Sequence, residues 1–167
     1  DYSLPAAPIA GGELTVYPGA IFTRGRAAWI GLAARVEALI GVDSRHNQHS
    51  DSLPTRAGGF STALRLRAPL SFGAAWVDAG LAGRTFVIDG AGSTDPDFPS
   101  VRFLGPHFGL GAELALPAHL ALAARAGTSL WTTGGELSSS AWFPAAQSWG
   151  FDAGLRLRWA LPRGFAP

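Results

Sequence analysis

Apolar and polar residues alternate along most of this chain with a period of two. In the longest run, from Ala28 to Asp43, one face is entirely apolar and every charge falls on the other face. Successive side chains of a β-strand point to opposite faces of a sheet, so this period predicts strands. Similar runs cover residues 60–70, 75–85, 104–116, 120–130 and 149–159, and a weaker one covers 13–22. The sequence therefore predicts an all-β protein in which seven strands are visible.

The connections between these runs alternate in length. Short corners fall at Gly25, Pro69 and Pro117, and long polar segments fall at 44–58, 89–100 and 133–147. Three segments, LRLRAPLSFG, ELALPAHLAL and LRLRWALPRG, each lead from a strand into a proline corner and form a weak internal repeat. This rhythm is typical of antiparallel up-and-down transmembrane β-barrels, which have an even number of strands in bacterial single-chain examples. We expect one domain over residues 1–167 with about eight strands, the eighth being built from residues 1–10 or missing from this sequence.

Alternation alone does not decide which face meets water, because a soluble lipocalin-like barrel has the same period with its apolar face inside. Here the opposite face is mostly Gly, Ala and Ser with occasional charges, unlike a solvated surface. The run from Ala28 to Asp43 also far exceeds the ~5 to 6 residues of an ordinary strand. Both features favour a membrane barrel with the aliphatic face toward lipid. The predicted lipid-facing residues are Ile30, Leu32, Val36, Leu64, Leu66, Val77, Leu110, Leu114, Leu122, Leu155 and Leu157.

Composition narrows the class of protein further. Charged residues make up 15% of the chain, against about 25% in soluble domains, and arginine supplies all 13 basic residues. The formal charge of +1 argues against a nucleic-acid partner. Cysteine is absent, which excludes disulfides and thiolate sites within this sequence. No apolar stretch reaches the ~18 residues of a membrane-spanning helix, so any span must be made of strands.

The face opposite the aliphatic one gathers the charges, which we expect to line the lumen. An ion-paired interior is the first interpretation, because unpaired charges in a narrow lumen cost several kcal/mol each. An excess of arginine also suits an anion-selective lumen or an anionic-ligand site. The predicted lumen charge network comprises Arg35, Glu37, Arg65, Arg67, Asp78, Arg84, His107, Glu113, Arg125, Asp152, Arg156 and Arg158.

Some of these residues could also carry chemistry. His107 and Glu113 share one face of a strand, and they could serve as a general base and its orienting carboxylate if Ser61 or Ser129 lay opposite. Barrel enzymes that remove acyl chains from lipid A use a related serine and histidine arrangement, but no local motif here resembles theirs. The alternative reading of His107 is a hydrogen-bonded interior histidine, and the barrel is expected to be non-enzymatic.

Two polar loops contain residue types that bind metals. The loop RHNQHSD and the loop DGAGSTDPDF lack the regular spacing of established zinc or calcium motifs, so solvated loops without a cofactor are expected. The residues concerned are His46, His49 and Asp51 in the first loop and Asp89, Asp95 and Asp97 in the second.

Tryptophan clusters near the predicted strand ends. Such positions are typical of the aromatic girdles at the borders of membrane barrels. Trp149 and Trp159 are predicted to bracket one strand on the lipid face. The girdle prediction covers Trp76, Trp131, Trp142, Trp149 and Trp159.

The segments GPHFGLGAELAL (105–116) and GFDAGLRLRW (150–159), with the short turns and polar loops, resemble the small bacterial outer-membrane β-barrel proteins. The resemblance implies a location in the Gram-negative outer membrane, insertion by the barrel-assembly machinery, and contact with outer-membrane lipid and lipopolysaccharide. Loops 44–58, 89–100 and 133–147 would then face other envelope proteins. The expected role is structural, anchoring or interaction. A narrow anion-preferring channel, a lipid-modifying enzyme and a soluble lipocalin-like carrier are the alternatives.

Overall fold

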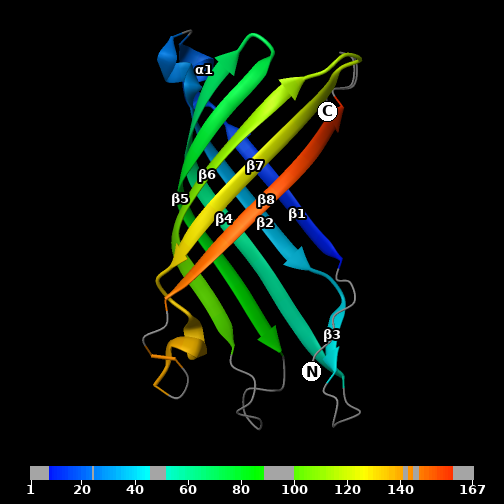
Figure 1. The fold of residues 1–167 in the computed structure, drawn as a ribbon, viewed down its shortest axis with the longest axis vertical. Helices are drawn as coiled ribbons and strands as arrows, with labels where there is room; N and C mark the ends of the chain where they lie inside the picture. Colours follow the sequence, from blue (N-terminus) through cyan, green and yellow to red (C-terminus); the bar gives the residue numbers. More distant parts are fainter. Residues whose placement is uncertain are drawn as a thin grey trace.

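The computed structural model describes residues 8–23, 25–45, 52–88, 100–140, 143–144 and 147–159. They form an antiparallel sheet that curls into a half-barrel (Figure 1). One end of the sheet carries a short helix and tight turns, and we call it the turn end; the opposite end, with the long connections, is the loop end. The elements are β1 (Ile9–Val16), α1 (Pro18–Phe22), the 3-10 helix η1 (Arg26–Trp29), β2 (Ile30–Leu39), β3 (Val42–Arg45), β4 (Ser52–Leu70), β5 (Gly73–Ile88), β6 (Val101–Ala115), β7 (Leu120–Trp131), the 3-10 helix η2 (Gly135–Ser138) and β8 (Ser148–Trp159).

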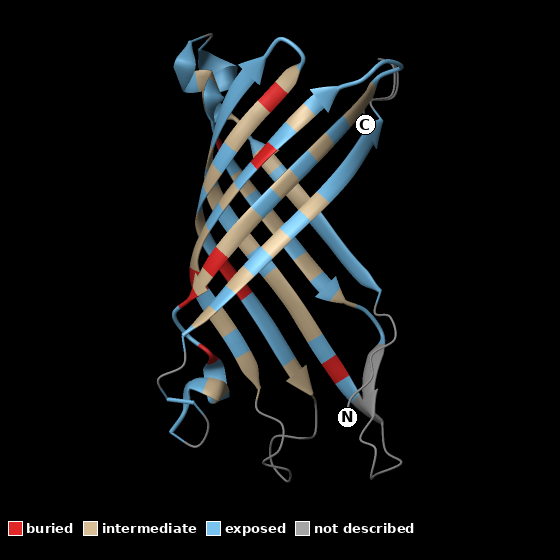
Figure 2. Ribbon diagram, in the orientation of Figure 1, coloured by how far each residue is buried: buried red, intermediate tan, exposed pale blue. Residues whose placement is uncertain are grey.

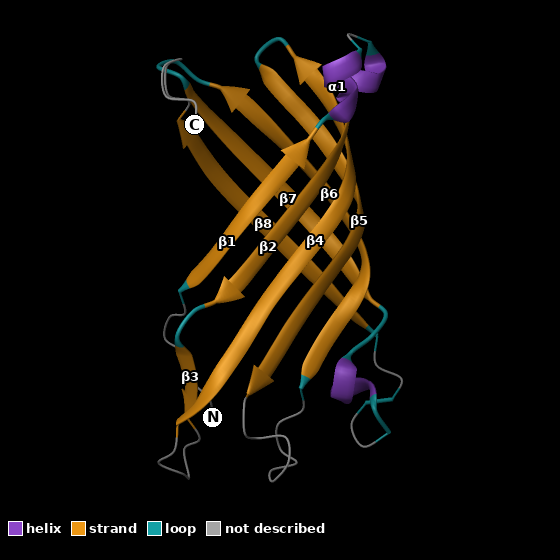
Figure 3. Cartoon of the chain, turned by 180° about the vertical axis from the view of Figure 1, so that it is seen from behind, coloured by secondary structure: helices purple, strands orange, loops and turns teal. Residues whose placement is uncertain are grey.

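Seven strands follow one another in the order β1, β2, β4, β5, β6, β7, β8. The short β3 resumes after β2 and pairs with the first residues of β4. Seen from behind, β1, β2, β4 and β5 lie in front, while β7 and β8 lie behind them (Figure 3). Apart from β3, each strand thus pairs with the next one along the chain, as predicted for an up-and-down arrangement, and the described strands number seven rather than eight along this path.

Side-chain exposure follows the alternation of the sequence. Along β2 and along β8 as far as Leu155, more buried and exposed residues alternate, and the same banding is visible along the other strands (Figure 2). The apolar residues are the exposed ones: Leu32 is 58% exposed, Leu64 57%, Leu110 62% and Leu155 79%. A globular protein in water would have the opposite arrangement.

Glycine on the inner face makes room for large side chains. A Cβ on Gly111 would lie 2.3 Å from the ring of Trp76, its partner in the register of β5 and β6. A Cβ on Gly127 would lie 2.7 Å from both the Asp152 carboxylate and the His107 ring. The abundance of small residues on this face, read from the sequence as a crowded interior, therefore has a direct steric cause.

Two predicted boundaries are wrong. The first strand was expected over 13–22, but β1 ends at Val16, and Pro18, which suits the first turn of a helix, begins α1. Residues 44–58 were expected as a loop, but β3 and the first residues of β4 pair across this segment. The run predicted from Ala28 also differs at both ends. Its first two residues belong to η1, and the strand stops before Gly41, which has a φ of +63°. The pairing of β2 with β4 therefore ends there, and β3 pairs with β4 beyond it.

The described helices are short. None of them is long and apolar enough to cross a membrane.

The turn between β6 and β7 is strained. Ala118 and His119 both have positive φ angles, 61° and 60°, and the hydrogen bond from Leu116 N to Leu120 O closes the hairpin at 2.8 Å. Two consecutive positive φ angles define a type I′ turn, which favours Asn and Gly because other residues strain there.

We therefore expect His119→Gly to stabilise the protein by about 1 kcal/mol. The measurement is the free energy of urea unfolding in detergent micelles, followed by tryptophan fluorescence. Ser71→Gly, in the turn between β4 and β5, is the control, because Ser71 does not have a positive φ. An equal gain from both substitutions would contradict the assignment of strain to the β6–β7 turn.

Candidate functional site: the charged lumen

Arg65 is the centre of the polar interior. Asp78 is its partner in the register of β4 and β5, and the two side chains form a bidentate pair, with Nε to Oδ1 at 2.7 Å and Nη2 to Oδ2 at 2.8 Å. Nη1 donates to Thr15 Oγ1 at 3.2 Å and lies 3.6 Å from Glu13 Oε1. The guanidinium also lies over the ring of Trp76, 5.0 Å from its centre. The side chains of Arg65, Asp78 and Glu13 are only 11%, 12% and 16% exposed.

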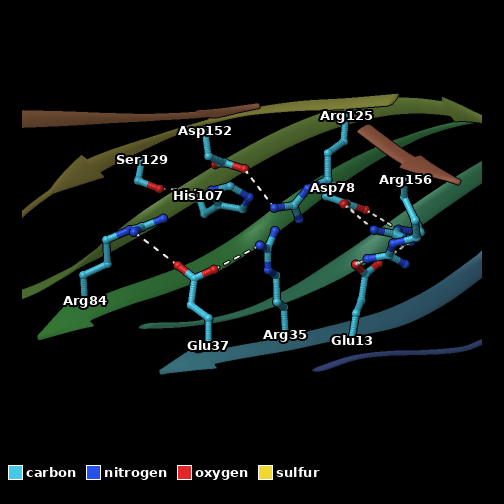
Figure 4. Close-up of polar contacts among 11 residues, drawn as sticks. Glu13, Arg35, Glu37, Asp78, Arg84, His107, Arg125, Ser129, Asp152 and Arg156 are labelled. Atoms are coloured by element: carbon cyan, nitrogen blue, oxygen red, sulfur yellow. Dashed lines mark hydrogen bonds and ion pairs between the residues drawn. The ribbon is translucent and has the colours of Figure 1, made fainter. Parts of the chain in front are cut away.

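Glu13 joins the two edges of the sheet. Its second carboxylate oxygen accepts a hydrogen bond of 2.5 Å from Arg156 Nη2 on β8 (Figure 4). One carboxylate on the first strand therefore binds an arginine in the middle of the sheet and another on the last strand. Glu13 was not among the predicted network residues, although it is the first residue of the strand predicted over 13–22. The alternation of Glu13 and Thr15 with Leu14 and Val16 was the available signal.

A second group of ion pairs lies nearer the loop end. Glu37 pairs with Arg35 at 3.0 Å and with Arg84 at 3.2 Å. Arg125 pairs with Asp152 at 3.4 Å. These five side chains border a cavity of about 40 Å³, which has space for little more than a water molecule.

The turn end holds a larger cavity, of about 630 Å³. Arg158 binds Glu113 there at 2.9 Å, and Arg67 lies over the ring of Tyr17, 5.8 Å from its centre. The residues that carry charge around this cavity are Glu13, Arg35, Arg65, Arg67, Glu113, Arg125, Arg156 and Arg158.

His107 and Ser129 face each other across β6 and β7. Their register is direct, and His107 Nδ1 lies 3.0 Å from Ser129 Oγ. The carboxylate expected to orient the histidine is elsewhere, because Glu113 is bound to Arg158. Ser61, the other candidate, pairs with Arg35 and Ala82 in the register of β4. The structure thus brings together the histidine and one serine, but it does not form the predicted triad.

The predicted site residues divide cleanly by face. The eleven residues predicted to meet lipid all lie among the exposed apolar side chains of the outer surface. The arginines and carboxylates of the predicted network lie on the inner face, and all except Arg67 take part in an ion pair between described residues. The parity of each strand was sufficient to predict which of these side chains share a face.

The tryptophans depart from the predicted girdle. Trp76 points inward to Arg65, and Trp131 is 8% exposed and stacks on Phe103 at 5.5 Å between ring centres. Only Trp149 and Trp159 are exposed on the outer face at the ends of β8. Trp142 lies outside the described residues.

Metal ligands are not assembled in the described part of the chain, where no group of three or more His, Asp or Glu side chains could hold an ion. The two loops considered for metal binding lie outside the described residues, with His46, His49, Asp51, Asp89, Asp95 and Asp97.

Comparison with protein-family models, with curated proteins and with solved structures finds no match to this chain. The fold and the lumen geometry therefore carry the functional argument.

Proposed function

We propose that this protein is an integral outer-membrane β-barrel with a structural, anchoring or interaction role. The observation that carries the proposal is the outer surface of the sheet. Along most of the strands from β2 to β8, the outward positions are uncharged, and most of them are aliphatic or aromatic. This holds for every outward position within residues 30–38, 58–70, 75–85, 104–114, 120–130 and 149–159.

Such a surface is costly in water. Exposed apolar area costs about 25 cal/mol per Å², and soluble monomers rarely expose contiguous apolar patches above several hundred Å². A soluble lipocalin-like carrier would enclose these side chains and expose the arginines, whereas here the arginines line the inside. A bilayer accepts the aliphatic surface and excludes charge from it, which supports an envelope location.

Lipid contact can be tested with fluorescent labels, because the chain has no cysteine. The variants Leu110→Cys, on the outer face, and Ala123→Cys, on the inner face, are labelled and refolded into phospholipid vesicles. We expect nitroxide groups on the lipid acyl chains to quench the label at 110 strongly and the label at 123 weakly, since only the first lies in hydrocarbon. Equal quenching, or recovery of folded protein in the aqueous fraction without detergent, would reject the membrane proposal.

The loop end supports an interaction role. The backbone N–H of Ser100 donates to Glu136 Oε2 at 2.6 Å, and Leu104 and Thr133 form an isolated bridge. These contacts fix η2 against the start of β6, so that this end presents a defined surface to a partner in the envelope.

A narrow anion-preferring channel is the second candidate, favoured by the charge of the lumen. The described inner face carries seven arginines, at 35, 65, 67, 84, 125, 156 and 158, and five carboxylates, at 13, 37, 78, 113 and 152. If the lumen conducts, we expect discrete conductance in planar bilayers with chloride preferred over potassium, and Arg67→Glu should weaken that preference. Verified insertion without conductance would reject this candidate and leave the structural role intact.

A further inference from the structure

The two edge strands of the sheet are not paired with each other. Among the described residues, backbone pairing joins β1 only to β2 and β8 only to β7. The cavity of about 630 Å³ reaches both edges, because Glu13 and Thr15 of β1 and Gly154, Leu155, Arg156 and Arg158 of β8 are among the residues that border it. We call this side of the sheet, where β1 and β8 form the edges, the seam; β8 crosses in front of β1 in Figure 1 and behind it in Figure 3.

The direction of the edges defines what fits the seam. Six successive antiparallel pairings lead from β1 to β8, so both edges run from the loop end to the turn end. A strand running in the opposite direction would pair antiparallel with both edges at once. It would satisfy the free N–H and C=O groups of two strands, which cost several kcal/mol each in hydrocarbon.

Charge defines the inner face of such a strand. Six arginines border the cavity, against only Glu13 and Glu113. Arg156 and Arg158 on β8 each bind one carboxylate, yet their side chains are still 56% and 60% exposed. Acidic side chains entering from the seam would meet these guanidinium groups at short range.

The outer face of the seam is apolar. Leu14 and Val16 flank it on β1, and Leu155 and Leu157 flank it on β8, all of them exposed. A strand that continues this surface must carry apolar side chains at alternate positions.

We propose that the seam binds one additional β-strand, the partner strand, that runs from the turn end to the loop end with acidic residues facing the lumen and apolar residues facing out. A second copy of this chain fits poorly. Antiparallel pairing of two identical edges would place the turn end of one copy beside the loop end of the other, which inverts one copy in a bilayer. This interaction surface rests on the membrane location proposed above and adds a partner of stated chemistry to it.

The test uses the full chain in detergent micelles and two synthetic peptides. Each peptide has eleven residues, with leucine at alternate positions and a central cysteine; the other positions carry Glu and Ser in one peptide and Arg and Ser in the other. Ala153→Cys on β8 and Leu14→Cys on β1 report on the two edges, and Ala79→Cys on β5, which is paired on both sides, is the control. We expect the acidic peptide to form disulfides at both edges about tenfold more than the basic one, and neither peptide to react appreciably at Ala79→Cys.

The direction of the partner strand is tested with peptides whose cysteine is moved from the centre to one end. A cysteine at the N-terminus should react with Leu157→Cys near the turn end, and one at the C-terminus with Phe151→Cys near the loop end. Four results would each overturn the proposal. The acidic and basic peptides could give equal disulfide yields, or the yield at Ala79→Cys could equal the yields at the edges. The peptide ends could react with the opposite positions, or dimers of Ala153→Cys could exceed its peptide adducts. The two edges give independent readouts if one variant does not fold, and vesicle quenching at position 110 tests membrane insertion separately.

Discussion

Arg65→Met is expected to destabilise the protein by about 3 to 5 kcal/mol, measured by urea unfolding in phospholipid vesicles. The arginine is 11% exposed and binds Asp78, Glu13 and Thr15 together. Methionine fills similar space but leaves two enclosed carboxylates without their main cation. The loss therefore measures the cost of uncompensated charge inside the barrel.

Arg84→Gln is the matched control. Its side chain is 54% exposed and makes one ion pair, to Glu37 at 3.2 Å, so we expect a loss below about 1 kcal/mol. The double variant Arg65→Met with Asp78→Leu should recover part of the loss, because it removes one of the unpaired carboxylates. If Arg65→Met and Arg84→Gln cost the same, Arg65 is not the centre of the lumen network.

Leu64→Arg should destabilise the protein by roughly 2 to 4 kcal/mol in vesicles, although the residue adjoins Arg65 in the sequence. Leu64 is 57% exposed on the outer face, near the middle of β4, where hydrocarbon would surround it. On the proposed membrane location, a guanidinium tolerated at position 65 should thus be rejected at position 64, because the strand directs the two side chains to opposite faces.

The control for this prediction lies at the turn end. Phe72 is 58% exposed in the turn between β4 and β5, at the border of the apolar surface, so Phe72→Arg should cost at most about 1 kcal/mol. The measurement is again vesicle unfolding. Similar costs at positions 64 and 72 would contradict a hydrocarbon layer centred on the sheet.

The sequence was most informative where one physical constraint acts on a whole strand. The faces of β2, β4 and β8 follow largely from parity, because along β8, and along β2 and β4 between Ile30 and Ala38 and between 58 and 70, aliphatic and charged side chains lie at alternate positions. Antiparallel neighbours follow from the short turns. The division between Leu64 outside and Arg65 inside could therefore be predicted before any geometry was known.

Pairing choices within the lumen could not be predicted in this way. Parity places Glu113 and His107 on one face, but whether Glu113 orients His107 or binds Arg158 depends on strand stagger and on the reach of long side chains. The contact of Glu13 with Arg156 depends on the curl of the sheet, which brings residues 143 positions apart into hydrogen-bond range. Neither the stagger of the strands nor the curl of the sheet can be read from the local sequence.

Strand ends were misread for two different reasons. Between Val16 and Phe22 the apolar residues continue, but Pro18 cannot donate a ladder hydrogen bond and instead begins a helix. Between 52 and 58 most residues are polar or small and one is proline, yet they pair as strand because β5 supplies a partner for Thr55 and Arg56. The first error therefore has a local cause, whereas at the second place tertiary pairing overrides local preference.

The strands of this sheet differ in length, with 19 residues in β4 and 16 in β5 against 12 each in β7 and β8. At about 3.3 Å per residue, that difference raises one wall of the half-barrel well above the other at the loop end. The rim is consequently oblique, and a molecule approaching along the axis meets the β4–β5 wall before it reaches the low side. On the low side, η2 follows β7 directly and is held to the start of β6 by the hydrogen bond from Ser100 N–H to Glu136, so the short wall carries a folded segment where the tall wall carries strand.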